Sequence, residues 1–210
     1  KNGNISTLNS FEEVLLAEKL ISINPWAEKV LFSRTGGEAN AIAVRLARAY
    51  TGKDKIAVCG YHGWHDWYLA ASKSNEKKIK KEQLPFYTST GVPKSLLNSI
   101  IPFEYNNLNS LKNIISKNKD IGVIKMEVER NEKPIANYLN EVRKIASKNN
   151  IVLIFDECTT GFRETFGGIY KKYKVIPDIA IFGKALGNGY PITAIVGKKD
   201  LMNMKEKTFI

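Results

Sequence analysis

A lysine and an aspartate each follow a short apolar segment of this 210-residue chain. Lys184 comes directly after Ile181-Phe182-Gly183 and precedes a glycine-rich turn, and Asp156 follows the apolar run Ile151 to Phe155. Short apolar runs of this kind are typical of buried strands. The sequence therefore predicts that an amine and a carboxylate are each presented at the end of a strand.

An amine and a carboxylate in these positions are the pair that pyridoxal phosphate chemistry requires. The lysine forms a Schiff base with the cofactor, and the carboxylate keeps the pyridine nitrogen protonated so that the ring can accept electrons. Taken alone, Lys184 is better explained as an ordinary surface lysine. Its neighbours Phe182, Leu186 and Tyr190 predict apolar surroundings, which would favour the neutral amine that this chemistry needs.

Glu157 follows Asp156 directly, so two carboxylates stand side by side in the sequence. Adjacent side chains on an extended segment point in opposite directions, so we expect only one of them to face the site. We choose Asp156, because a buried carboxylate there would need a cationic partner such as a pyridinium. Glu157 is expected to make a structural salt bridge or hydrogen bond.

A glycine-containing turn offers a place for a phosphate. Thr35-Gly36-Gly37-Glu38 combines a Gly-Gly turn with the start of a predicted helix. Glycines let the backbone approach a ligand, and the free N–H groups of a first helical turn favour an anion. Turn glycines before helices are common, so this motif is weak evidence by itself.

The run Tyr61 to Asp66 (YHGWHD) follows a predicted strand and therefore lies where ligands of open α/β sheets bind. One of its aromatic side chains could stack on a planar cofactor; alternatively, the aromatics only pack. A metal site at His62, His65 and Asp66 is disfavoured, because only one carboxylate is near and the chain has no other histidine.

Composition and net charge bear on the kinds of partner that this chain could bind. The net charge of +11 could suggest nucleic acid as a partner, yet the densest basic run, Lys73 to Lys81, has no interleaved aromatics for base stacking. We therefore expect no nucleic-acid partner. No apolar run approaches the length of about 20 residues that spans a bilayer, so no membrane partner is expected either.

Cys59 and Cys158 are the two cysteines of the chain, and neither belongs to a metal-binding spacing. Both follow apolar runs, which predicts buried free thiols. Free thiols fit a reducing compartment, so we expect a cytoplasmic protein.

Strands alternate with helices along the sequence. A capping box at Ser10 to Glu13 predicts a helix to about Ser22, and Thr51-Gly52 closes a second helix that begins near Glu38. This alternation predicts an α/β fold with a mostly parallel sheet covered by helices on both faces. Strands are expected at residues 55–59, 121–126, 151–155 and 179–182, a further helix around residues 138–145, and a long loop at 73–93.

Taken in order, these segments resemble the class III (ω-type) aminotransferases of the fold-type I pyridoxal phosphate enzymes, and most closely their glutamate-1-semialdehyde 2,1-aminomutase branch. The resemblance runs from about Ser10 to Met202. The motifs that carry it are TGGEANAIAVRLARAYTGKDKI, YHGWHD, GVPKS, LIFDECTTGFR and PDIAIFGKALGNGYPITAIVGKKDL.

The resemblance implies a role for each candidate residue. Lys184 is similar to the Schiff-base lysine, which also moves the proton, and Asp156 to the partner of the pyridine nitrogen. Cys158 and Tyr61 resemble the residues on the two faces of the ring. The remaining cofactor-binding candidates are Gly36 and Gly37 at the phosphate and His62 beside Tyr61.

The sequence also departs from the family's pattern. The phosphate turn usually carries a hydroxyl where this chain has Gly37, and the aminomutase branch usually has a proline where this chain has Val128. The resemblance implies a transaminase that uses an amino donor, a carbonyl acceptor and a pyridoxamine intermediate. An intramolecular aminomutase and a degenerate, non-catalytic scaffold are the alternatives.

The resemblance further implies that residues 1–210 form the cofactor-binding large domain. A C-terminal small domain, and a phosphate-binding threonine from a neighbouring subunit, are expected beyond Ile210. We therefore expect a homodimer as the active form.

Overall fold

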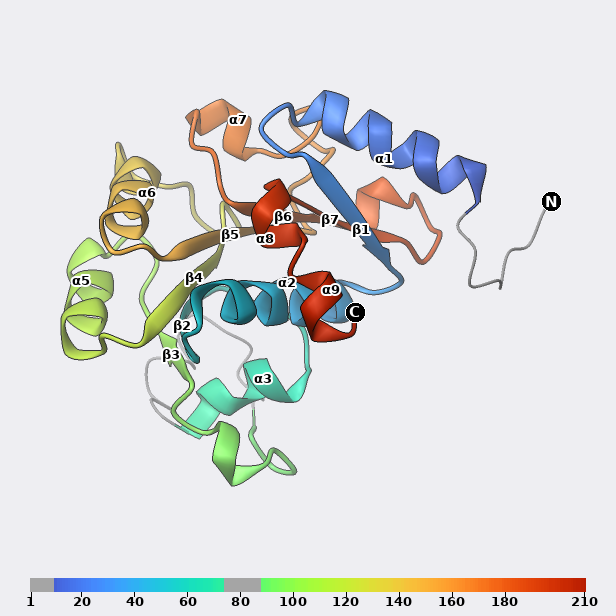
Figure 1. Cartoon of the computed structure of the whole chain (residues 1–210). Helices are drawn as coiled ribbons and strands as arrows, with labels where there is room; N and C mark the ends of the chain where they lie inside the picture. Colours follow the sequence, from blue (N-terminus) through green and yellow to red (C-terminus); the bar gives the residue numbers. More distant parts are fainter. Residues whose placement is uncertain (1–9, 74–87) are drawn as a thin grey trace.

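The computed structural model describes residues 10–73 and 88–210, and these residues form one α/β unit (Figure 1). The strands are β1 (Lys29–Ser33), β2 (Lys55–Cys59), β3 (Ile100–Pro102), β4 (Ile121–Glu127), β5 (Val152–Glu157), β6 (Ile179–Phe182) and β7 (Thr193–Gly197). The α-helices are α1 (Phe11–Ile23), α2 (Gly36–Thr51), α3 (Asp66–Leu69), α5 (Leu108–Lys117), α6 (Tyr138–Lys148), α7 (Tyr170–Tyr173), α8 (Lys199–Met202) and α9 (Lys205–Thr208).

The seven strands form one mixed sheet in the order β1-β7-β6-β5-β4-β2-β3. The pairs β2-β3, β2-β4, β4-β5 and β5-β6 are parallel, whereas β7 runs antiparallel to both β1 and β6. The predicted fold class, a mostly parallel mixed sheet, is confirmed. The predicted strands at 55–59, 121–126, 151–155 and 179–182 are β2, β4, β5 and β6; β1, β3 and β7 were not predicted.

The predicted start of α1 at its capping box and the predicted end of α2 at Gly52 are both confirmed. Ser10 and Glu13 form the capping box of α1, and Gly52 ends α2 in a left-handed conformation with φ of 64°. The start of α2 was predicted two residues too late: the helix begins at Gly36, so both glycines belong to its first turn. The predicted loop at 73–93 lies largely outside the described residues.

Two hydrophobic clusters cover the two faces of the sheet. One cluster contains Ile124 and Met126 of β4 together with residues of α1, α5, α6 and α7, and the other contains Val123 together with residues of α2, α3 and α8. Figure 1 shows α2 lying along one face of the sheet, with α5 and α6 away from it. Among the described helices, none has both the length and the hydropathy to cross a bilayer.

The topology brings one end of several strands together. The carboxyl ends of β2, β4, β5 and β6 lie at the same edge of the sheet because these strands are parallel. The pairing of Ser33 with Thr193 places the end of β1, and hence the start of α2, at this edge too. Ligands of open α/β sheets bind at such an edge.

Asp178 ties this sheet to α6. Its carboxylate accepts hydrogen bonds from the Leu153 amide and the Arg143 guanidinium, both at 2.8 Å, and from Lys198 Nζ at 2.6 Å. Burial opposes ionisation, but these donors hold the pKa of Asp178 below its ordinary value. A depressed pKa in the folded state stabilises the fold above the pKa of the unfolded chain and loses this contribution as the pH falls.

We therefore expect Asp178→Asn to lower the free energy of unfolding by about 1 to 3 kcal/mol at pH 7. The difference should shrink in acid, below the ordinary aspartate pKa of about 4. Urea unfolding of both proteins across this pH range measures it. The control is Asp120→Asn, which removes an exposed ion pair with Lys55 and should change stability by less than about 1 kcal/mol. Equal losses in the two variants would contradict the role of Asp178.

Candidate cofactor site

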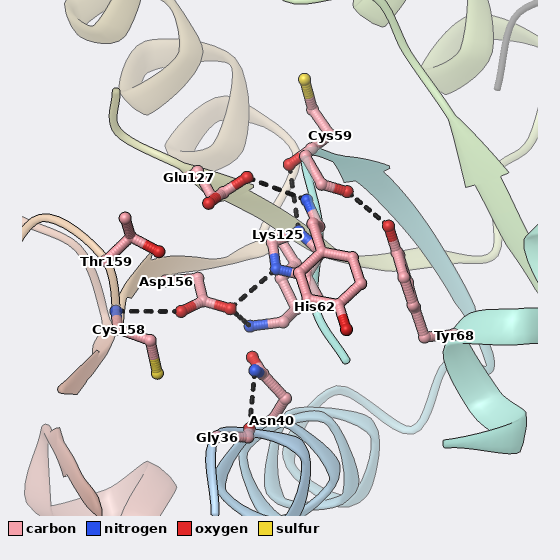
Figure 2. Close-up of polar contacts among 12 residues, drawn as sticks. Gly36, Asn40, Cys59, His62, Tyr68, Lys125, Glu127, Asp156, Cys158 and Thr159 are labelled. Carbon is pink, nitrogen blue, oxygen red and sulfur yellow. Dashed lines mark hydrogen bonds and ion pairs between the residues drawn. The ribbon is translucent and has the colours of Figure 1, made fainter. Parts of the chain in front are cut away.

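The carboxylate of Asp156 lies at the centre of the site, near the end of β5 (Figure 2). It is 4% exposed, and its Oδ2 atom lies 2.8 Å from His62 Nδ1 and 3.9 Å from Lys125 Nζ. Its Oδ1 atom accepts the Cys158 amide at 3.1 Å. Burial alone would raise the pKa of Asp156, but Lys125, His62 and the Cys158 amide hold it well below its ordinary value. Asp156 is therefore a buried anion with donors on both oxygens.

His62 connects Asp156 to the loop after β2. Its ring is 1% exposed, with Nδ1 on Asp156 and Nε2 3.0 Å from the Cys59 carbonyl oxygen. Burial, followed by the charge of Lys125, lowers the pKa of His62. These two contacts fix the ring plane, so His62 orients the carboxylate from one side.

Glu157 has the structural role that its position predicted. Its side chain points away from Asp156 and accepts hydrogen bonds from the amides of Ile169 at 3.0 Å and Tyr170 at 2.9 Å and from the Thr160 hydroxyl at 2.5 Å. Burial raises the pKa of Glu157. The alternation along β5 thus assigns one carboxylate to the site and the other to the loop that precedes α7.

The first turn of α2 lies beside this carboxylate. A Cβ atom on Gly36 would lie 3.4 Å from the Cys158 sulfur, and one on Gly37 would lie 3.2 Å from His65 Nε2. The Thr35 hydroxyl accepts a hydrogen bond from the Glu38 amide, and the Thr35 carbonyl accepts one from the Ala39 amide. Among the described residues, this leaves the amides of Gly36 and Gly37 as donors at a helix start, an arrangement suited to a phosphate.

Tyr61 lies between the loop after β2 and the end of β4. Its amide donates to Glu127 Oε2 at 2.9 Å, and its half-buried ring lies 5.5 Å from the Arg130 guanidinium and edge-on to Tyr68. Burial raises the pKa of Glu127 to about 7. The backbone of Tyr61 is thus fixed by a carboxylate that the sequence motifs did not reveal.

Lys184 lies just beyond β6 and is exposed, with φ of 45°. Its Nζ atom donates to the Thr159 hydroxyl at 2.8 Å. The apolar surroundings predicted for it are wrong within this chain: Phe182 is buried in the sheet, and Tyr190 is 82% exposed. Gly183 lets the segment lie close to the turn after β5, since a Cβ there would lie 3.2 Å from the Cys158 sulfur.

Both cysteines are free thiols, as predicted, but only Cys59 is buried. Cys158 is half-buried, because its sulfur lies between the glycines at 36 and 183 at the open edge of the sheet. Burial, followed by the charge of Asp156, raises the pKa of the Cys158 thiol. The thiol is therefore a neutral packing group, and the prediction that it is buried was too strong.

Several site residues escaped the sequence analysis. Lys125, Glu127 and Thr159 contact the predicted residues directly. Among residues 10–73 and 88–210, no three acidic, histidine or cysteine side chains gather as metal ligands, and His62 and His65 face different neighbours. A cavity of about 390 Å³ adjoins Glu127, with Tyr105, Arg130 and Glu132 in its wall.

Comparison with known proteins identifies the family. The model of the family "Aminotransferase class-III" matches residues 2–208. The chain belongs to this family. A 3-aminobutyryl-CoA aminotransferase from Cloacimonas acidaminovorans is 40% identical over 93% of this chain and 45% of its own length. A glutamate-1-semialdehyde 2,1-aminomutase from Sulfurisphaera tokodaii is 39% identical over 92% of this chain and 46% of its own length.

A solved structure gives the same result for the fold. An omega-transaminase from Sphaerobacter thermophilus superposes with a TM-score of 0.82 at 28% identity, covering 94% of this chain and 47% of that one. The chain thus spans about half the length of the curated class III aminotransferases and aminomutases that it matches.

The class III family implies pyridoxal phosphate as the cofactor, and the residues present fit it. The buried anion Asp156 matches a protonated pyridine nitrogen, and a carboxylate held ionised is suited to keeping that proton in place. Two amides at the start of a 16-residue helix match the phosphate, and Gly36 and Gly37 leave no side chain in the way. A primary amine, Lys184, is available at the same edge of the sheet.

Gly60 provides a test of how the Tyr61 loop is held. It has φ of 98°, and an added Cβ would lie 2.5 Å from Glu127 Oε2. We expect Gly60→Ala to lose about 1 to 2 kcal/mol of stability through the left-handed backbone. Displacement of Glu127 should add a further loss of about 1 kcal/mol and weaken binding of pyridoxal phosphate.

Gly91→Ala is the matched control, because Gly91 has φ of 88° and nothing within 4 Å of an added Cβ. Urea unfolding and fluorescence titration with the cofactor measure the two effects. If both variants lose the same stability and keep their cofactor affinity, Glu127 does not hold the Tyr61 loop.

Proposed function

We propose that this chain provides the cofactor-binding part of a pyridoxal-phosphate-dependent class III aminotransferase. The observation that carries the proposal is the buried, ionised Asp156, oriented by His62 at the strand edge where Lys184 and the start of α2 also lie. Family membership supports the same reaction class.

Each chemical task has a residue of suitable type. Lys184 would supply the amine for the cofactor's aldehyde and the base for the substrate α-proton, and Thr159 holds this amine by a hydrogen bond. Asp156 would pair with the pyridine nitrogen, while Gly36 and Gly37 would hold the phosphate through their amides. Pyridoxal phosphate, when bound, supplies the aldehyde and an electron-withdrawing ring.

The two faces of the ring are assigned to Tyr61 and Cys158. Tyr61 follows β2 and Cys158 follows β5, so they approach the edge of the sheet from different strands. The raised pKa of the Cys158 thiol supports a neutral packing role rather than a nucleophilic one.

The substrates are an amino donor and a carbonyl acceptor. The cavity beside Glu127 is a candidate for their recognition, because Arg130 and Glu132 in its wall can pair with charged groups. These residues follow Val128 closely, and Val128 is the position at which the sequence departs from the aminomutase branch. General transamination is therefore our first proposal, and glutamate-1-semialdehyde 2,1-aminomutase activity, which a 39% identical relative is named for, is the second.

We also propose a cytoplasmic homodimer of the full-length protein. Two free thiols support a reducing compartment. Helix α1 exposes Phe11, Val14 and Leu15, an apolar surface that supports contact with a second subunit.

Replacement of Lys184 by alanine tests the reaction class. The full-length protein with cofactor should show a visible absorption band that depends on this amine, and Lys184→Ala should abolish the band and reduce transaminase activity to background. Lys199→Ala removes an exposed lysine elsewhere and should leave both unchanged. A protein that takes up no cofactor would instead point to a degenerate scaffold.

The need for an external amino donor separates the two activities. We expect the cofactor-loaded enzyme to convert carbonyl acceptors only when an amino donor is supplied. Chromatographic analysis of products with and without a donor measures this. Conversion of glutamate-1-semialdehyde with no donor present would reject general transamination in favour of the aminomutase.

A further inference from the structure

Lys125 is a lysine in the middle of a buried strand. Its side chain is 0% exposed, and it points from β4 toward α2, on the face where Val123 packs in the hydrophobic cluster. Among the described residues, its Nζ atom has no hydrogen-bond partner. The carboxylate of Asp156, 3.9 Å away, is the charged group paired with it.

An amine buried in this way is costly unless it compensates a charge of opposite sign. Asp156 is such a charge, because it is itself 4% exposed. The Asn40 side chain points from α2 toward this pair in Figure 2. Its Oδ1 atom is also buried without a hydrogen-bond partner in the described part of the chain, while its amide nitrogen donates to the Gly36 carbonyl. Asn40 thus offers an acceptor on the α2 side of Lys125.

The other titratable groups near the Lys125 amine include Glu127 and His62. Burial lowers the pKa of Lys125, and the charges of Asp156 and of Glu127, the next residue on the same face of β4, oppose this lowering. His62 Nδ1 also contacts the Oδ2 atom of Asp156, and the other ring nitrogen of His62 lies against the Cys59 carbonyl oxygen. Lys125 therefore has an anionic environment and no solvent.

We propose that Lys125 is a resident counter-ion for Asp156. It balances the buried carboxylate before the cofactor binds, and it competes for the same carboxylate with the pyridine nitrogen afterwards. The competition with the pyridine nitrogen rests on the proposed function, in which Asp156 faces that nitrogen. Lys125 is a positioning residue, since it acts on the cofactor through Asp156.

The competition has a chemical consequence. Two cations that share one anion repel each other, so the proton on the pyridine nitrogen is held less firmly than beside a carboxylate without an ammonium neighbour. The electron-withdrawing power of the ring depends on this proton. Lys125 therefore sets how strongly this site activates its cofactor.

A double-mutant cycle on the cofactor-free, full-length protein tests the ion pair. Lys125→Met keeps the length of the side chain and removes its charge, and Asp156→Asn removes the charge of the partner. We expect Lys125→Met to lower the urea midpoint of unfolding when Asp156 is present, and to raise it or leave it unchanged in the Asp156→Asn background. Lys55→Met, which removes a partly exposed lysine from β2, should act equally in both backgrounds. Additive effects of Lys125 and Asp156 would overturn the pairing.

Cofactor binding tests the competition. We expect Lys125→Met to bind pyridoxal phosphate more tightly, by roughly tenfold for the loss of one competing charge. The nitrogen-15 NMR signal of labelled cofactor should show the pyridine nitrogen protonated to higher pH than in the unmodified protein. Lys125→Gln, which is also neutral, provides the same comparison if the methionine variant does not fold.

The outcomes separate the two proposals. If Asp156→Asn weakens cofactor binding but neutral variants of Lys125 change neither the affinity nor the nitrogen-15 signal, the competition is overturned. If neither residue affects cofactor binding, Asp156 does not hold the pyridine nitrogen and the proposed site fails, together with the competition. The stability cycle still decides whether Lys125 and Asp156 form a pair.

Discussion

The buried negative charge of Asp156 is the constraint on which the site depends. A carboxylate out of water costs several kcal/mol unless donors and opposite charges surround it. Its partners come from separate parts of the chain: His62 from the loop after β2, Lys125 from β4 and the amide of Cys158 from the turn after β5. Parallel pairing of β2, β4 and β5 is what brings these three segments to one carboxylate. The order of the strands in the sheet therefore determines which groups balance the charge of Asp156.

The sequence predicted those parts of the fold whose signals are local. The capping box at Ser10, the left-handed Gly52 and the apolar runs of the parallel strands each depend on a few neighbouring residues. The strands β1 and β7 were missed because their pairing is long-range and antiparallel, joining Lys29 to Gly197. All five residues of β1 are only partly buried, so its pattern of hydrophobicity does not distinguish it from a loop.

The site was predicted less completely than the fold, for a similar reason. Motifs identified Asp156 and the start of α2, but Lys125 lies within an apolar run, where one lysine does not interrupt the prediction of a strand. Only the alternation of β4, combined with the parallel neighbour β5, shows that this lysine faces Asp156. The surroundings of Lys184 were mispredicted because its left-handed backbone directs the amine toward Thr159 instead of along the apolar strand.

The arrangement separates two electrostatic tasks between two kinds of structure. At α2, an anion would be met by backbone amides and the helix dipole, without a charged side chain in the first turn other than Glu38, which caps it. At β4 and β5, charge is balanced by side chains whose positions are fixed by strand register. Backbone amides do not titrate, whereas Asp156 and the two groups in contact with it, His62 and Lys125, are all titratable. A ligand that reaches from the start of α2 to Asp156 would thus be held by the helix amides, and its charge would be balanced by side chains of β4 and β5. Under the proposed function, substitutions in β4 would therefore change the charge balance at Asp156 and leave the backbone amides at the start of α2 in place.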